Sequence, residues 1–211
     1  MVKNYKPMIL VFAGANGSGK STITGLVDTV GKYVNADEIK KSMLCSDLAA
    51  AECAEQIREQ CVDNLQDFTF ETVLSTPRNL ELLKRAKEKG YFIKSFYVLT
   101  SSPEINIARV QTRAINGGHD VPVDKIRSRY TRTLAMLPSL IKICDICNVH
   151  DNSLEQPERI FSKKLGTYRL WETATWNKEK IIALTHQQEY TQMFLKPTNS
   201  VSVIGSTKRK R

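Results

Sequence analysis

The stretch GANGSGKST, residues 14–22, fits the phosphate-binding pattern G-x-x-x-x-G-K-[ST] at every fixed position. The apolar segment MILVFA, residues 8–13, precedes it and is typical of a buried parallel strand. The segment STITGLVDTV, residues 21–30, follows it and has the length and apolar spacing of a helix. A strand, a glycine-rich turn and a helix are the context that this pattern requires, so the stretch predicts a loop that binds the phosphates of a nucleoside triphosphate.

Each residue type in this loop has a predicted task. The glycines let successive backbone N–H groups face one anion, and the start of a helix adds a favourable dipole. The Lys20 ammonium is expected to reach the β- and γ-phosphates and to be catalytic, and the Ser21 hydroxyl to bind Mg²⁺. The predicted nucleotide-binding residues are Gly14, Ala15, Asn16, Gly17, Ser18, Gly19, Lys20, Ser21 and Thr22.

Size and composition predict a globular α/β protein. The chain has 211 residues, of which 41% are hydrophobic and 25% charged. No apolar run reaches the ~20 residues that span a bilayer, and the first apolar run leads into the phosphate loop instead of a signal cleavage site. Five cysteines without the spacing of a disulfide framework indicate a reducing compartment, so we expect a cytoplasmic protein.

The net charge of +9 is concentrated at the C-terminus. Residues 196–211 hold five Lys or Arg and no acid, which leaves 26 basic and 22 acidic residues, or +4, for the remainder. An excess of this size suits an enzyme that holds several phosphates. We therefore expect one domain over residues 1–190 and a basic, flexible tail over 191–211, with a contact of the tail with nucleic acid as the disfavoured alternative.

Strands and helices are predicted to alternate along the chain. After the phosphate loop we expect strands over residues 32–36, 68–73, 91–100 and 146–150. Helices are predicted over residues 46–66, 78–90 and 103–116, and from residue 123 onward with an interruption near Pro138. Residues 153–190 are expected to cap the sheet. This alternation predicts a parallel sheet covered on both faces, with ligands beyond the carboxyl ends of its strands.

Two acidic residues follow predicted strands and point to an acceptor site. Asp37 ends the second strand, where a carboxylate can accept the proton of an attacking hydroxyl; a helix N-cap is its alternative role. Glu71 is an unusual residue for an apolar strand unless it faces a polar pocket. With Thr72 and Ser75 it is predicted to bind the hydroxyls of a substrate, the alternative being a structural polar contact at the sheet edge.

Five arginines flank the turn NGGHDVP, residues 116–122: Arg109, Arg113, Arg127, Arg129 and Arg132. Arginine neutralises the charge that phosphoryl transfer places on the phosphate oxygens. A glycine hinge between two arginine-bearing helices is typical of a lid that closes over a triphosphate. We predict that Arg113 and one of Arg127 or Arg129 are catalytic, and that the others belong to a solvated basic face.

Other functional classes find little support. His119 and Asp120 lack a third ligand nearby and are expected to form the turn instead of a metal site. Cys144 and Cys147 form a C-x-x-C without a second pair, which favours core packing over zinc or redox chemistry. The chain lacks a guanine-specific NKxD signature and an LSGGQ-like segment of transporter ATPases. A small-molecule kinase is the class that remains.

Five segments, taken in order, resemble the zeta-toxin family of P-loop kinases over about residues 7–152. They are GANGSGKST, VNADEIKKS, FTFETVLST, RAKEKGYFIKSFYVLTSSPE and RVQTRAINGGHDVPVDKIRSRYTRT. The resemblance implies a P-loop kinase-like three-layer sandwich with a mostly parallel sheet and an arginine-bearing helical lid. It also implies phosphorylation of a hydroxyl of UDP-N-acetylglucosamine or a related nucleotide sugar, with ATP or GTP and Mg²⁺, and for many relatives an antitoxin that blocks the nucleotide site.

The same resemblance assigns roles to single residues. Asp37 matches the catalytic base, Glu71 the acidic residue of the family's E-G-T-like substrate segment, and Arg113 the first lid arginine. The segment here reads ETV in place of E-G-T, which leaves the acceptor open. The alternatives are a P-loop kinase for another acceptor (an antibiotic, a nucleoside or a cofactor) and an ATP-gated nucleic-acid-binding protein.

Overall fold

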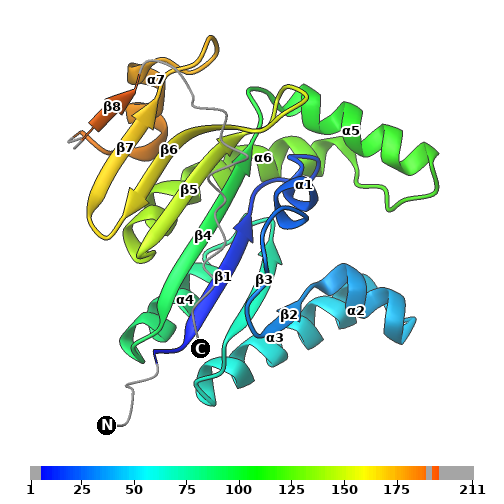
Figure 1. Cartoon of the computed structure of the whole chain (residues 1–211). Helices are drawn as coiled ribbons and strands as arrows, with labels where there is room; N and C mark the ends of the chain where they lie inside the picture. Colours follow the sequence, from blue (N-terminus) through cyan, green and yellow to red (C-terminus); the bar gives the residue numbers. More distant parts are fainter. Residues whose placement is uncertain (1–5, 189–191, 195–211) are drawn as a thin grey trace, which may run out of the picture.

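The computed structural model describes residues 6–188 and 192–194. Within these residues the sheet has eight strands in the order β2-β3-β1-β4-β5-β6-β7-β8 (Figure 1). The strands are β1 (Met8–Ala13), β2 (Lys32–Val34), β3 (Phe68–Thr72), β4 (Phe92–Leu99), β5 (Ile146–Asp151), β6 (Glu158–Lys164), β7 (Thr167–Trp171) and β8 (Gln192–Phe194). Neighbours from β2 to β5 are parallel, β6 is antiparallel to both β5 and β7, and β8 is parallel to β7. The predicted mostly parallel α/β sheet is confirmed.

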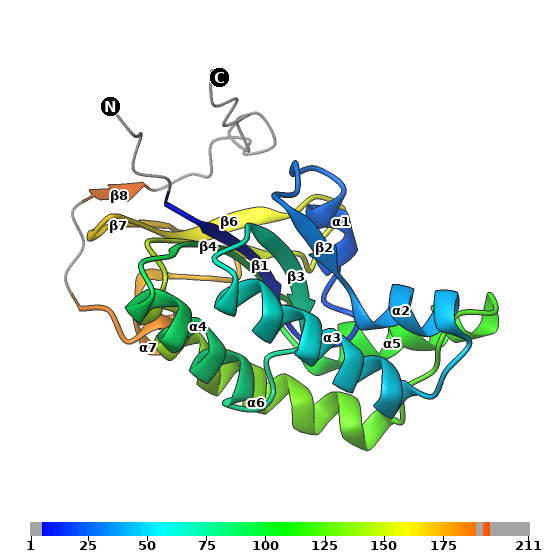
Figure 2. The ribbon, with the colours of Figure 1, turned by 90° about the horizontal axis from the view of Figure 1, so that it is seen from below.

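Seven helices lie within the described residues: α1 (Lys20–Thr24), α2 (Ala36–Met43), α3 (Asp47–Asp63), α4 (Arg78–Glu88), α5 (Pro103–Ile115), α6 (Val123–Ile143) and α7 (Lys178–Thr185). The sheet carries helices on both faces, but unequally. In Figure 2, α3, α4, α6 and α7 lie on one side of it. Their apolar side chains form the main core with alternate residues of the strands, among them Val11, Phe70 and Val149. On the other face Ile23 of α1 packs on Leu10, Phe12, Phe96 and Val98.

Two helices differ from the sequence-based expectation. The helix after the phosphate loop ends at Thr24 instead of continuing to residue 30, and its C-cap is Gly25, a residue type that disfavours continuation of a helix. The predicted interruption near Pro138 is wrong, since α6 runs through it without a break. Proline removes one helix hydrogen bond, but Leu137 and Leu140 on either side of it are fully buried and hold this turn against the sheet.

The C-terminal part of the described chain extends the sheet edge. Residues expected to cap the sheet form β6, β7 and α7, and β8 continues the sheet beyond residue 190. The predicted tail over residues 191–211 lies outside the described residues except for residues 192–194, which form β8 instead of a flexible segment. Both cysteines of the C-x-x-C pair are buried, which confirms their expected place in the core. No helix in the described part of the chain is long and apolar enough to cross a membrane.

Candidate active site

The phosphate loop joins the carboxyl end of β1 to α1 and is held by neighbouring elements. Gly17 and Gly19 have φ values of 75° and 88°, which favour glycine. A Cβ atom on Gly17 would lie 2.4 Å from Asn106 O, and one on Gly19 would lie 1.9 Å from Asn152 Nδ2. Both glycines are therefore required by close approach as well as by backbone conformation.

Two buried asparagines fix the loop by hydrogen bonds. Asn106 Nδ2 donates to Asn16 O at 2.6 Å, and Asn152 Nδ2 donates to Ser18 O at 2.9 Å. Both side chains come from elements remote in sequence: Asn106 lies in α5, and Asn152 directly follows β5. The sequence analysis missed them, because the only available signal is a polar residue placed where a core residue is expected. The loop keeps its shape through contacts made by the protein itself.

Lys20 is the residue around which the predicted site gathers. Its Nζ donates to Gly14 O at 2.8 Å and to Ala15 O at 3.2 Å. Burial lowers the pKa of Lys20 to about 8, against the opposing effect of the nearby carboxylates of Glu71 and Asp37. The guanidinium groups of Arg113 and Arg129 lower this pKa further. Four residues that the sequence placed in the site are thus close enough to Lys20 to influence its proton.

The remaining loop residues divide between buried and exposed positions. Ser21 and Thr22 lie exposed in the first turn of α1, where a hydroxyl can reach a bound metal. The Ser18 hydroxyl is buried and has no hydrogen-bond partner among the residues that the structure describes. An unpaired buried polar atom inside a phosphate-type loop fits a ligand rich in acceptor oxygens. Among the described residues no group of three or more His, Cys, Asp or Glu side chains could hold a metal by itself.

Glu71 is held in place by two hydroxyl groups. Its Oε1 accepts from Tyr33 Oη at 2.6 Å and from Thr24 Oγ1 at 3.0 Å. Burial and the bond to Glu71 raise the pKa of Tyr33, so the phenol stays a donor. Asn35 Nδ2 donates in turn to Tyr33 Oη at 3.2 Å. Tyr33 and Asn35 escaped the sequence analysis because their role depends on the parallel pairing of β2 with β3.

Asp37 occupies the first turn of α2 with an exposed side chain. The alternative role of Asp37 as the helix N-cap is wrong, because Asn35 is the cap and its Oδ1 accepts from Asp37 N at 2.9 Å. The carboxylate of Asp37 is therefore not committed to capping. One hydrogen-bonded series now links Thr24, Glu71, Tyr33 and Asn35 to the backbone of Asp37.

Thr72 and Ser75, the other predicted acceptor contacts, lie just past Glu71. The Thr72 hydroxyl is buried and accepts from Leu74 N at 2.9 Å and Asn79 Nδ2 at 2.8 Å. These bonds stabilise the turn after β3 and occupy the lone pairs of the hydroxyl. The structure does not bring the Thr72 hydroxyl to a free surface. Ser75 is half-buried beyond this turn.

The two candidate arginines of α6 point in different directions. Arg129 Nη1 donates to Asn16 Oδ1 of the phosphate loop at 3.1 Å. Arg127 forms an ion pair with Glu104 and is exposed. Residues two apart on a helix lie about 200° apart around its axis, so only one of them can face the loop. The structure brings Arg129 to the site and leaves Arg127 outside it.

The other residues of the predicted lid lie around the turn between α5 and α6. Arg113 Nη2 donates to His119 O at 2.9 Å, which folds its guanidinium onto this turn. Asp120 Oδ1 accepts from Val121 N, which agrees with the predicted turn role of Asp120. Arg109 Nη2 reaches Ser153 O at 3.5 Å, while its Nη1 is buried without a partner. Arg132 is exposed on α6.

Comparison with known proteins gives one family. Residues 34–153 match the sequence profile described as Zeta toxin. This range contains Asp37, Glu71, Arg113 and Arg129, and it begins after the phosphate loop. An uncharacterized protein of Haemophilus influenzae is 29% identical over 127 residues, which are 57% of this chain and 91% of that protein.

Solved structures show the same fold at low sequence identity. One belongs to the PezAT chromosomal toxin–antitoxin system of the human pathogen Streptococcus pneumoniae. It has a TM-score of 0.55 and 16% identity, over 90% of this chain and 82% of that one. The AvrRxo1-ORF1:-ORF2 structure with ATP has a TM-score of 0.64 and 14% identity, over 90% of this chain and 66% of that one. At these identities the likeness concerns the fold, and function has to be argued from the site.

Proposed function

The chain belongs to the zeta toxin family, and from this premise we propose that it is a kinase that transfers the γ-phosphoryl group of ATP or GTP to a hydroxyl of a small molecule. The observation that carries the proposal is the set of four charged groups around Lys20. The carboxylates of Glu71 and Asp37 raise the pKa of Lys20, and the guanidinium groups of Arg113 and Arg129 lower it. A cation, a candidate base and anion-neutralising guanidiniums are the parts that phosphoryl transfer needs.

The phosphate loop would hold the nucleotide. Its backbone N–H groups and Lys20 would bind the phosphates, and the orphaned Ser18 hydroxyl fits this role. The exposed Ser21 hydroxyl would bind Mg²⁺ together with phosphate oxygens. Mg²⁺ supplies charge neutralisation on those oxygens when bound. The ATP in the AvrRxo1 structure of the same fold supports ATP as the donor.

The chain's own residues would then divide the reaction between them. Asp37 accepts the proton of the acceptor hydroxyl while that oxygen forms its bond to the γ-phosphorus and the bond to the bridging oxygen breaks. Glu71 has one oxygen bound to Tyr33 and Thr24, so its second oxygen is available for an acceptor hydroxyl. Arg129, and Arg113 once its turn moves, neutralise the transferred group.

For the acceptor we propose UDP-N-acetylglucosamine or a related nucleotide sugar. Family membership supports this choice, together with the hydrogen bonds that connect Glu71 through Tyr33 and Asn35 to the backbone of Asp37. A different small-molecule acceptor is the second candidate, because the segment after Glu71 reads Thr72–Val73 where relatives have Gly-Thr. An antitoxin partner is proposed from the toxin–antitoxin system to which the Streptococcus pneumoniae relative belongs. We also propose that residues 1–190 form the kinase domain.

The decisive experiment is mass spectrometry of UDP-N-acetylglucosamine incubated with the protein, ATP and Mg²⁺. We expect a product heavier by one phosphoryl group. Asp37→Ala should abolish this product while nucleotide binding, measured by calorimetry, is retained. Normal turnover by Asp37→Ala would remove Asp37 as the base. ATP binding without any change in the sugar nucleotide would reject this acceptor and favour the second candidate.

A further inference from the structure

Within the described part of the chain, no helical layer covers one face of the sheet over β4–β7, the face opposite α4 and α6 (Figure 2). We call it the outer sheet face. Among the described helices only α1 packs on this side, and it covers β1 and part of β4 through Ile23. Figure 2 shows α4, α6 and α7 on the opposite side of these strands. Because β6 is antiparallel to both β5 and β7, this part of the sheet can leave one face without a helical layer, and the composition of that face is informative.

The strand register places four cations on the outer sheet face. Arg159 lies opposite His150, and Lys164 lies opposite Ile146, which in turn pairs with Lys94. Arg169 lies opposite Ser162. The two acids within these described strands, Asp151 and Glu158, lie opposite each other and are adjacent in sequence to His150 and Arg159. Because side chains alternate along a strand, both acids belong to the other face.

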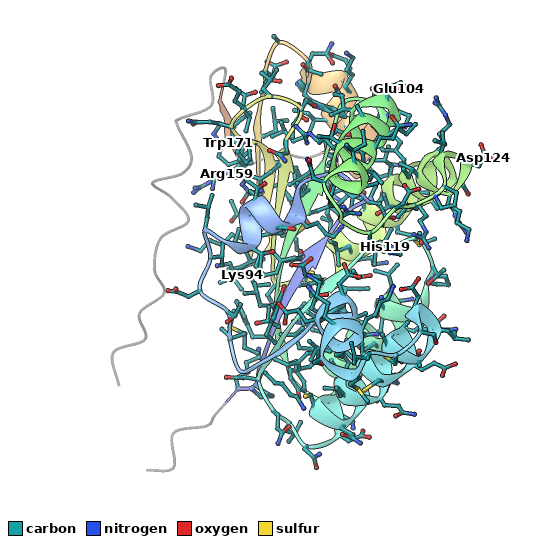
Figure 3. All side chains as sticks on the ribbon, turned by 90° about the vertical axis from the view of Figure 1, so that its right-hand side faces the viewer. Lys94, Glu104, His119, Asp124, Arg159 and Trp171 are labelled. Atoms are coloured by element: carbon teal, nitrogen blue, oxygen red, sulfur yellow. The ribbon has the colours of Figure 1, made fainter. Side chains whose placement is uncertain are left out.

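Aromatic rings support two of these cations. The guanidinium of Arg159 lies 4.1 Å from the ring centroid of Trp171, and Lys94 Nζ lies 5.0 Å from that of Phe96. Both rings are buried, whereas the cations above them are half-buried. Figure 3 shows Lys94, Arg159 and Trp171 along one side of the sheet, away from His119 and Asp124. These two contacts hold the positive charges of Lys94 and Arg159 on the outer sheet face.

This arrangement is electrostatically unfavourable for the protein alone. Within the described part of the chain, no carboxylate forms an ion pair with Lys94, Arg159, Lys164 or Arg169. Burial and the neighbouring Arg169 lower the pKa of Arg159, and burial lowers that of Lys94. His150 is buried beside them and burial lowers its pKa to about 3, so it is neutral at pH 7. Uncompensated charge of one sign indicates a surface selected for an anionic ligand.

Two buried polar atoms on this face also lack partners among the residues that the structure describes. Within residues 6–188 and 192–194, Arg159 Nε and His150 Nδ1 have no hydrogen bond, and the His150 side chain is only 3% exposed. Such orphans are rare in folded proteins. An anion with oxygen acceptors would satisfy the N–H of Arg159 and reduce the repulsion between Arg159 and Arg169.

We propose that the outer sheet face binds single-stranded nucleic acid through its backbone phosphates. The cations lie on β4, β6 and β7, and these strands with β5 between them span about 14 Å at the usual strand spacing, which is wider than one phosphate group. A ligand with several phosphates in a row matches this width. The Arg159 guanidinium, which lies 4.1 Å from the centroid of the Trp171 ring, also offers a plane on which a base can stack. This surface is distinct from the Lys20 site, whose charged neighbours include none of these residues.

The test is fluorescence anisotropy with a labelled 12-mer of oligouridylate, using the full chain with Lys20→Ala so that the phosphate loop does not compete. The double variant Lys94→Gln/Arg159→Gln is compared with the control double variant Lys84→Gln/Lys142→Gln. The two control lysines are exposed and lie on α4 and α6. Both pairs remove two charges. We expect the outer-face pair to lower the slope of log affinity against log salt by about 1.4, and the control pair to leave it within about 0.3.

A third variant separates binding from folding. Arg169 is exposed, so Arg169→Gln should keep the thermal unfolding midpoint and lower the salt slope by about 0.7. Equal losses in the outer-face and control pairs would overturn the proposal. So would equally tight binding of a 12-residue polyglutamate, or of phosphatidylserine vesicles, because the face would then be a general anion surface.

Discussion

The strand side and the lid side of the candidate site are built differently. On the strand side, Glu71 is half-buried and receives two hydrogen bonds from Tyr33 and Thr24. On the lid side, Arg113 is exposed and donates to a backbone carbonyl of its own turn. The strand side is therefore fixed before any ligand binds, whereas we propose that a charged ligand draws Arg113 of the lid side toward the site. This difference predicts which substitutions impair chemistry and which impair positioning.

The largest effect is expected on the lid. Arg129→Ala should lower the rate of transfer by about 10³-fold or more, because a guanidinium at the transferred group stabilises charge that develops in the transition state. Arg127→Ala, two residues away and paired with Glu104, is the matched control and should change the rate by less than about tenfold. Steady-state kinetics of both variants measure this. Equal losses would show that α6 rotates when the lid closes.

The next effect concerns the strand side. Tyr33→Phe removes the 2.6 Å bond to Glu71, and a hydrogen bond to a charged group contributes about 1.5–3 kcal/mol. We expect kcat/KM for the acceptor to fall by about 10- to 100-fold while the Kd for ATP stays unchanged. Tyr168→Phe, on β7 and outside the site, serves as the control. An equal change in ATP affinity would mean that Tyr33 supports the phosphate loop instead of Glu71.

A smaller effect follows from the protonation of Lys20. Its pKa is lowered to about 8 by burial, so the free protein loses the ammonium above that pH. Phosphate binding needs the charged form, and the Kd for ATP should rise by up to about tenfold per pH unit above pH 8. Below pH 8 the protonation of Lys20 should no longer change the Kd for ATP. Lys20→Arg remains charged throughout, so calorimetry should show this rise lost in the variant.

The sequence predicts the candidate site because the signals for it are local. The phosphate loop, Lys20 and the odd polar Glu71 are readable from a few adjacent residues. The asparagines that fix the loop and the tyrosine that holds Glu71 depend on contacts between residues 38 to 134 apart in sequence. The choice between Arg127 and Arg129 likewise depends on the rotation of α6 about its axis, which tertiary packing sets.

The smallest effect on catalysis is expected at Thr72. The sequence predicts that the Thr72 hydroxyl binds the substrate. In the structure this hydroxyl accepts hydrogen bonds from Leu74 N and Asn79 Nδ2 in the turn after β3. Thr72→Val keeps the shape of the side chain and leaves both donors without their partner. Denaturant unfolding should therefore show a loss of about 1–3 kcal/mol in stability. We expect KM for the acceptor to change by less than about threefold, since a turn held by the rest of β3 keeps Glu71 in place. Ser75→Ala is the companion variant. Because the Ser75 hydroxyl does not make the two bonds described for Thr72, this substitution should leave stability unchanged. A large rise in KM for Thr72→Val at unchanged stability would mean that the Thr72 hydroxyl binds the substrate after all.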